Sequence, residues 1–171
     1  MKNDTNKNKD KLLKKLCNKV GKTIIDQNLI VDGDNVLVGI SGGKDSYILL
    51  ETLANRKKAF PFKFKLSAVH VEVENVDYVI NKNYMQDICR NLDIPLIQKK
   101  ISLKENSKNK SVCFICSWQR RNTIFNLSRE LGCNKLAFGH HRDDALQTFL
   151  MNLMYHGSIS SMPYSLKMFE G

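Results

Sequence analysis

The sequence lacks any run of about 18 apolar residues, the length that a helix needs to cross a bilayer. Its N-terminal residues 1–9 are polar and lysine-rich, and no apolar core of a secretory signal follows them. It also lacks internal repeats. We therefore expect a cytoplasmic protein without a membrane partner, whose five cysteines are thiols or metal ligands rather than disulfides.

Negative charge is scarce as well. The chain has 17 Asp and Glu against 27 Lys and Arg, a formal net charge of +10. Residues 1–23 carry eight lysines and two aspartates, and residues 98–110 carry five lysines and one glutamate. Clustered cations favour a polyanionic partner, nucleic acid first, although lysine-rich surfaces also serve solubility or reflect codon usage. No aromatic-rich RNA recognition motif is present to decide between these readings.

At 171 residues the chain is long enough for one domain with a single core. We expect a disordered basic tail over residues 1–10, an amphipathic helix within 11–30 and a globular domain over 31–171. The apolar face of that helix is predicted to comprise Leu12, Leu13, Leu16, Val20, Ile24 and Ile25. A final helix from about Asp143 is predicted to turn inward Leu146, Phe149, Leu150, Leu153 and Met154.

Strands and helices alternate four times in the domain. Strands are expected near residues 36–40, 65–72, 94–101 and 135–139, with an exposed lysine-rich loop at 104–110. This order predicts an α/β fold: a parallel sheet with helices on both faces. Ligands of such sheets bind at the carboxyl ends of the strands. The segments after the first, third and fourth strands are therefore expected to converge on one site.

The first of these segments is Gly39-Ile40-Ser41-Gly42-Gly43-Lys44-Asp45-Ser46. Two glycines bring backbone N–H groups close to a ligand, and two serines and a lysine add donors and charge. The following helix directs its positive end to the same place. The segment is typical of a phosphate-binding loop but is not a Walker loop, which has four residues between its glycines. The alternative is an ordinary Gly-Gly turn before a helix.

Cys113-x-x-Cys116 is the second chemically rich segment. On its own this spacing fits part of a zinc site, part of an iron–sulfur cluster, a redox dithiol or no site at all. The other thiols are poorly placed to complete a zinc site, because Cys89 and Cys133 precede strands and fall at the opposite edge of the sheet. For these two and for Cys17 we expect simple packing.

The third segment is Gly139-His140-His141-Arg142-Asp143-Asp144. One interpretation is purely structural: the aspartates complement the helix N-terminus, and His140 fills space at a strand end. Beside a phosphate loop, however, a carboxylate could hold Mg²⁺, and a histidine could contact phosphate or move a proton.

Ser41 to Ser46 resembles the loop of the PP-loop ATP pyrophosphatase superfamily, whose pattern is Ser-Gly-Gly-x-Asp-Ser. With Cys113-x-x-Cys116, Arg120-Arg121, residues 139–148 and Met162-Pro163, the chain closely resembles the tRNA 2-thiocytidine biosynthesis (TtcA) family. The resemblance covers nearly the whole chain from about Leu12. It implies that residues 31–171 are a PP-loop ATP-binding domain, incomplete at its C-terminus and without the last strand, so that a second chain or a homodimer could complete it.

The resemblance implies an ATP-dependent tRNA sulfurtransferase that adenylates the C2 oxygen of an anticodon-loop cytidine and replaces it with sulfur. It implies ATP, Mg²⁺ and a [4Fe–4S] cluster on three cysteines, of which Cys113 and Cys116 match the first two and the third is absent from this chain. The partners implied are tRNA and a sulfur donor, either a cysteine desulfurase or sulfide. The alternatives are a non-catalytic or partner-dependent ATP- or RNA-binding fragment, or another PP-loop tRNA-modifying enzyme such as a lysidine synthetase.

The same resemblance gives each candidate residue a role. The catalytic candidates are Lys44, Asp45 and Asp143; the nucleotide-binding candidates are Ser41, Gly42, Gly43, Lys44, Asp45, Ser46, His70, Gly139 and His140; the metal ligands are Cys113 and Cys116; and the RNA- or phosphate-binding candidates are Arg120, Arg121 and Arg142.

Overall fold

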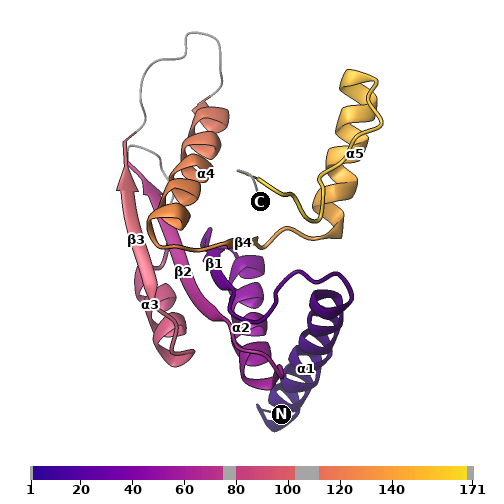
Figure 1. The fold of residues 1–171 in the computed structure, drawn as a ribbon. Coiled ribbons are helices and arrows are strands. Elements are labelled where there is room, and N and C mark those ends of the chain that lie inside the picture. The colour runs from indigo at the N-terminus through magenta and orange to yellow at the C-terminus, as the bar shows by residue number, and fades with distance from the viewer. Residues whose placement is uncertain (1, 75–79, 103–111, 169–171) are drawn as a thin grey trace. The chain divides into compact units, whose positions relative to one another are not determined.

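The structure is a computed structural model that describes residues 2–74, 80–102 and 112–168, and the elements of the chain are labelled in Figure 1. The predicted loop at 104–110 lies outside the described residues. The chain forms two compact units, divided between Phe138 and Gly139. The first holds α1 (Lys2–Asp26), β1 (Asn35–Gly39), α2 (Lys44–Ala59), β2 (Lys65–Val73), α3 (Lys82–Asn91), β3 (Leu96–Ile101), α4 (Val112–Glu130) and β4 (Lys135–Phe138), and the second holds α5 (Arg142–His156).

The four strands form one parallel sheet in the order β3-β2-β1-β4. The register places Gly39, the last residue of β1, beside Val69 of β2 and Phe138 of β4. Within the described residues β4 pairs only with β1, so its other side is an edge of the sheet. The predicted α/β fold with a parallel sheet is confirmed.

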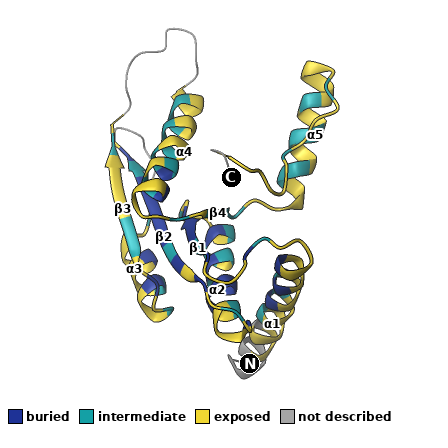
Figure 2. Cartoon of the chain, viewed as in Figure 1, coloured by how far each residue is buried: buried dark blue, intermediate teal, exposed yellow. Residues whose placement is uncertain are grey.

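Helices cover both faces of the sheet. Because successive residues of a strand point to opposite sides, each strand contributes side chains to the core on either face. Val36 and Val38 of β1 belong to a core cluster with residues of α1, α2 and α3. Leu37, between them, belongs to a second cluster with Ile124 of α4. Figure 2 shows the two central strands as the most buried elements of the first unit. Burial of each large apolar side chain stabilises such a core by about 1.5–3 kcal/mol.

A polar network holds the amino ends of β1 and β4 together. The buried carboxylate of Asp34 accepts hydrogen bonds from the Val31 backbone N–H at 2.7 Å and from Asn134 Nδ2 at 2.7 Å. Asn134 Oδ1 in turn accepts from the Asn35 backbone N–H at 2.8 Å. The two contacts of Asn134 span about a hundred positions of sequence, so they fix β4 against β1.

α1 differs from expectation in its length and in its buried face. It begins at Lys2, so residues 2–10, expected to be disordered, are helical. Its buried positions are Cys17, Gly21 and Ile24, whereas Leu12 and Ile25 are 59% and 52% exposed. The stripe is shifted because the side chain of Arg56 from α2 lies against Gly21, in the space that glycine leaves open.

The apolar face of α5 was predicted to turn inward, and this prediction is wrong for the second unit. α5 has no buried residue: Leu146, Leu150, Leu153 and Met154 are 45–76% exposed, and Phe149 is half-buried. The unit is small, and the segment after α5 contacts the helix through few side chains, such as Asn152 with Ser160. None of the helices in the described part of the chain is long and apolar enough to span a membrane.

Candidate functional site

The loop between β1 and α2 depends on glycine at position 42. Gly42 has a φ of +92°, a conformation that side chains other than glycine rarely adopt. A Cβ atom there would also lie 2.9 Å from Cδ1 of Ile80, a contact too short to keep. The loop therefore turns tightly over an apolar side chain.

The N-terminus of α2 has hydrogen-bond donors to offer to an anion. Gly43 is the N-cap residue and provides no side chain to cap the helix. The nearby hydroxyls bind elsewhere: Ser46 Oγ donates to the Gly43 carbonyl at 2.8 Å, and Ser41 Oγ accepts from the Gly43 N–H at 3.2 Å. The first N–H groups of a helix need acceptors, and phosphate supplies them together with charge that matches the helix dipole. Lys44, at this end, is exposed.

A pocket of about 90 Å³ lies beside this loop, at the carboxyl end of the sheet. It is lined by Gly39, Ile40, Ser41, His70, Val71, Arg120, Ile124 and Phe138. Three predicted site residues from separate elements thus meet here: Ser41 from the loop, His70 from β2 and Arg120 from α4. The aromatic ring of Phe138 closes one side, lying where a side chain at Gly39 would have to be.

His70 is held in one orientation inside the sheet. Its side chain is buried, and its Nδ1 lies 2.8 Å from the carbonyl oxygen of Ile40. A carbonyl only accepts, so Nδ1 carries the proton and Nε2 keeps its lone pair. Burial lowers the pKa of His70, partly opposed by the Ile40 bond, and the charge of Arg120 lowers it further. A neutral imidazole with an acceptor nitrogen is therefore the form present at neutral pH.

The lowered pKa of His70 predicts a loss of stability in mild acid. Above the ordinary pKa of 6.5 the imidazole is neutral in both the folded and the unfolded chain; below it only the unfolded chain gains the proton readily. The free energy of unfolding should thus be level above about pH 7.5 and fall as pH drops through 6.5. Urea unfolding across pH 5.5–8 measures this. His70→Asn, whose amide can still donate to Ile40, should flatten the profile; an unchanged slope would contradict the prediction.

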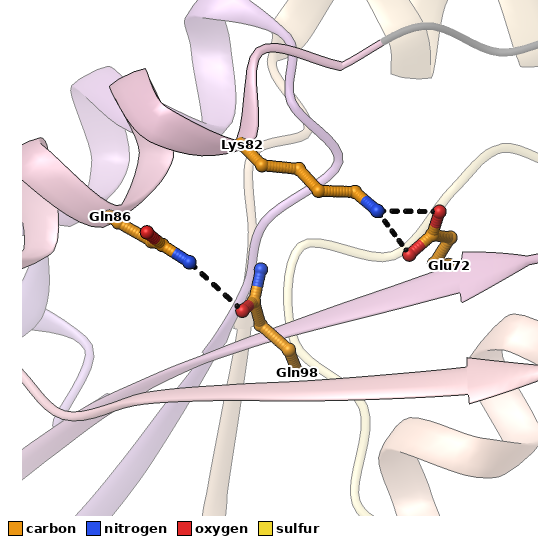
Figure 3. Close-up of polar contacts among 4 residues, drawn as sticks. All are labelled: Glu72, Lys82, Gln86 and Gln98. Carbon is orange, nitrogen blue, oxygen red and sulfur yellow. Dashed lines mark hydrogen bonds and ion pairs between the residues drawn. The ribbon is translucent and has the colours of Figure 1, made fainter.

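α3 holds Ile80 against the loop through contacts that sequence patterns do not reveal. Lys82 Nζ lies 2.8 Å from each carboxylate oxygen of Glu72 in β2, and Gln86 Nε2 donates to Gln98 Oε1 at 3.4 Å (Figure 3). The hydrogen bond from Lys82 lowers the pKa of Glu72. These contacts tie the start of α3 to the sheet two residues after Ile80. No local signal could have predicted that Ile80 packs on Gly42.

The two candidate metal ligands lie in the first turns of α4. Cys113 is exposed and Cys116 is half-buried, and their spacing of three residues puts them on neighbouring positions of the helix surface. Arg120, one turn further, lines the pocket, whereas Arg121 is exposed. Among the described residues there is no group of three or more His, Cys, Asp or Glu placed to hold a metal ion.

The other cysteines pack, as predicted. Cys17 and Cys89 are buried, and Cys133 is half-buried against the second core cluster. Burial raises the pKa of the Cys89 and Cys133 thiols, which disfavours the thiolate that binds metals.

The histidine–aspartate segment belongs to the second unit. Asp144 caps the N-terminus of α5. Its carboxylate accepts a hydrogen bond from the backbone N–H of His141, the N-cap residue, at 2.7 Å. Its neighbours His140, Arg142 and Asp143 are exposed. Because Phe138 pairs with Gly39, the chain leaves β4 at the same edge as the loop. The expected convergence of residues 139–143 with the loop stays a prediction.

Comparison with known sequences agrees with the resemblance to PP-loop proteins. The sequence model of a family described as the PP-loop domain matches residues 5–166. A tRNA-cytidine(32) 2-sulfurtransferase of a Polaromonas species is 38% identical over 94% of this chain and 53% of that protein. The protein of the same name from Paraburkholderia xenovorans is 38% identical over 95% of this chain and 49% of its own length. The chain thus spans about half the length of these curated relatives.

Among solved structures, the U34-tRNA thiolase NcsA from Methanococcus maripaludis, determined with its [4Fe–4S] cluster, is similar to this chain. The TM-score is 0.69 at 24% sequence identity, over 86% of this chain and 51% of that one. At this identity the comparison shows a shared fold.

Proposed function

The chain belongs to the PP-loop domain family, and from this premise we propose that it is the ATP-binding portion of a tRNA-cytidine 2-sulfurtransferase. The substrate would be the cytidine at position 32 of tRNA, which the names of its relatives specify. The observation that carries the proposal is the loop before α2, where bare helix amides and Lys44 adjoin a pocket with His70 and Arg120. A cytoplasmic location follows from this substrate.

The reaction has two steps. The C2 oxygen of cytidine attacks the α-phosphorus of ATP, the bond to the β-phosphate breaks, and pyrophosphate leaves. A sulfur nucleophile then attacks C2, and the C2–O bond breaks as AMP leaves with the oxygen. The chemistry needs a site that binds polyphosphate, stabilises charge at the α-phosphate and excludes water.

Residues of this chain can meet these needs. The N–H groups at the start of α2 and the Lys44 ammonium would bind phosphate oxygens and stabilise the charge that builds up on pyrophosphate. Arg120, at the pocket, would hold the α-phosphate or an RNA phosphate in a bidentate manner. His70 would accept a hydrogen bond at Nε2, from a ribose hydroxyl or the exocyclic amine of a base. Asp45 and Asp143 are our candidates for binding Mg²⁺.

Cys113 and Cys116 fit part of an iron–sulfur site. They are the two thiols of the described chain that are neither buried nor packed in the core, and they precede Arg120 by one to two turns. A cluster bound there would hold the sulfur that is transferred. Two thiolates are fewer than such a cluster needs, and the described residues hold no group of three or more His, Cys, Asp or Glu side chains placed to bind it. The sulfur donor would be a cysteine desulfurase or sulfide.

Analysis of tRNA nucleosides tests the proposal. Cells without the gene for this chain should lose 2-thiocytidine from total tRNA, as measured by mass spectrometry, and the intact gene should restore it. Unchanged 2-thiocytidine would exclude this function. Loss of another modified nucleoside, such as lysidine, would assign a different PP-loop reaction.

A further inference from the structure

A second cavity, of about 350 Å³, lies between α1 and α2. It is lined by Asp10, Leu13, Lys14, Cys17 and Asn18 of α1 and by Asn55 and Arg56 of α2. Arg56 lies twelve residues after Lys44 on the same helix, about 18 Å along its axis. This cavity is therefore separate from the nucleotide pocket, at the opposite end of α2.

Arg56 is fixed in this cavity by contacts with Phe60 and Gly21. Its guanidinium stacks on the ring of Phe60, 4.8 Å from the centroid, and lies against Gly21 of α1. A Cβ on Gly21 would be 2.5 Å from Nε of Arg56, so the arginine occupies the space that glycine leaves open. Nε is buried and has no hydrogen-bond partner among the described residues. None of the ion pairs between described residues includes Arg56. Arg56 as a whole is half-buried and lines the cavity, so it can offer its positive charge to an anion that binds there.

The surroundings of the cavity are basic. The last turn of α2 contributes Arg56, Lys57 and Lys58, and these two lysines are exposed. Exposed lysines of α1 follow at positions 11, 14 and 15. One carboxylate, Asp10, lies in the lining against the two cations Lys14 and Arg56. Positive charge on both helices favours a ligand that presents phosphates in a row.

We propose that the α1–α2 cavity binds a backbone phosphate of the tRNA substrate. Arg56 and Lys14 supply the charge, and the side-chain amides of Asn18 and Asn55 supply N–H donors. One N–H of Asn55 donates to the Glu51 carbonyl at 2.9 Å, which leaves its second N–H for the phosphate. This inference rests on the proposed function for the identity of the RNA. It adds an anchoring site at the other end of α2 from Lys44, about 18 Å along the helix axis, which positions the tRNA without reading its sequence.

Gly21→Ala tests this site without changing the charge of the protein. The new methyl group displaces the flexible end of Arg56, and alanine favours helix more than glycine, so the fold should be kept. We expect tRNA affinity, measured by fluorescence anisotropy, to fall about tenfold, as for the loss of one charged hydrogen bond. The slope of log K against log salt should decrease by about one. Thr23→Ala, an exposed neutral substitution two residues further on, is the matched control and should leave both unchanged.

The variant Arg56→Met provides a second test of the α1–α2 cavity. It should weaken tRNA binding as much as Gly21→Ala does, and the double variant should be no weaker than either, because both remove the same contact. ATP binding should be unaffected in all variants. Wild-type tRNA affinity and salt slope in Gly21→Ala and Arg56→Met would overturn the inference while leaving the proposed function standing. Absence of tRNA binding by the unsubstituted chain would overturn both.

Discussion

Substituting alanine for Lys44 is expected to lower tRNA-dependent release of pyrophosphate by about 100- to 1,000-fold, the usual effect of removing one group that stabilises transition-state charge. Lys44 is the first residue of α2, directly after Gly43, where the helix has no side-chain cap. A cation at this point lies within reach of phosphates bound by the helix amides. Its loss would remove one of the positive charges that stabilise the charge developing on pyrophosphate.

The fold should survive this substitution, since Lys44 is exposed and alanine is a good helix former. The measurement is a coupled assay of pyrophosphate release, with thermal unfolding as the check on folding. Lys44→Arg, which keeps the charge but alters its shape, should recover part of the rate. Lys63→Ala removes an exposed lysine of a loop and should release pyrophosphate at the wild-type rate. Near-normal release by Lys44→Ala would contradict the role given to Lys44.

The parts of the fold that could be predicted from the sequence are those encoded locally. The apolar run at residues 36–40 predicted β1, and the segment that follows it predicted the loop and a helix directly after the loop. Alternation of the elements then gave the parallel sheet, because few topologies accommodate it. The edge-of-sheet argument placed Ser41 at the site, whereas Arg120 was a candidate through the family resemblance, and the structure brings both to one pocket.

The features that could not be predicted depend on distant contacts. The buried stripe of α1 is centred on Gly21 because Arg56 of α2 passes across it, and apolar periodicity carries no trace of that arginine. The bond of His70 to Ile40 depends on the register between β1 and β2. Ile80 packs on Gly42 for a similar reason. The apolar face of α5 was assigned inward from its pattern alone, and the pattern cannot say which surface covers it.

Replacing both Cys113 and Cys116 by serine is expected to abolish 2-thiocytidine formation while leaving ATP binding within about threefold of wild type. Serine has nearly the same size but is a harder ligand than a thiolate, and iron–sulfur clusters need thiolates. Both positions are in the first turns of α4, where neither side chain is buried, so the substitutions should cost little stability. The nucleotide loop belongs to α2 and does not depend on them.

The measurement is mass spectrometry of nucleosides from cells whose only copy of the gene carries both substitutions. Cys133→Ser is the matched control, because this thiol is half-buried against the second core cluster and burial raises its pKa, so it binds no metal under the proposal. That variant should keep 2-thiocytidine. If the double variant keeps it too, sulfur does not pass through Cys113 and Cys116, and α4 then serves the site through Arg120 alone.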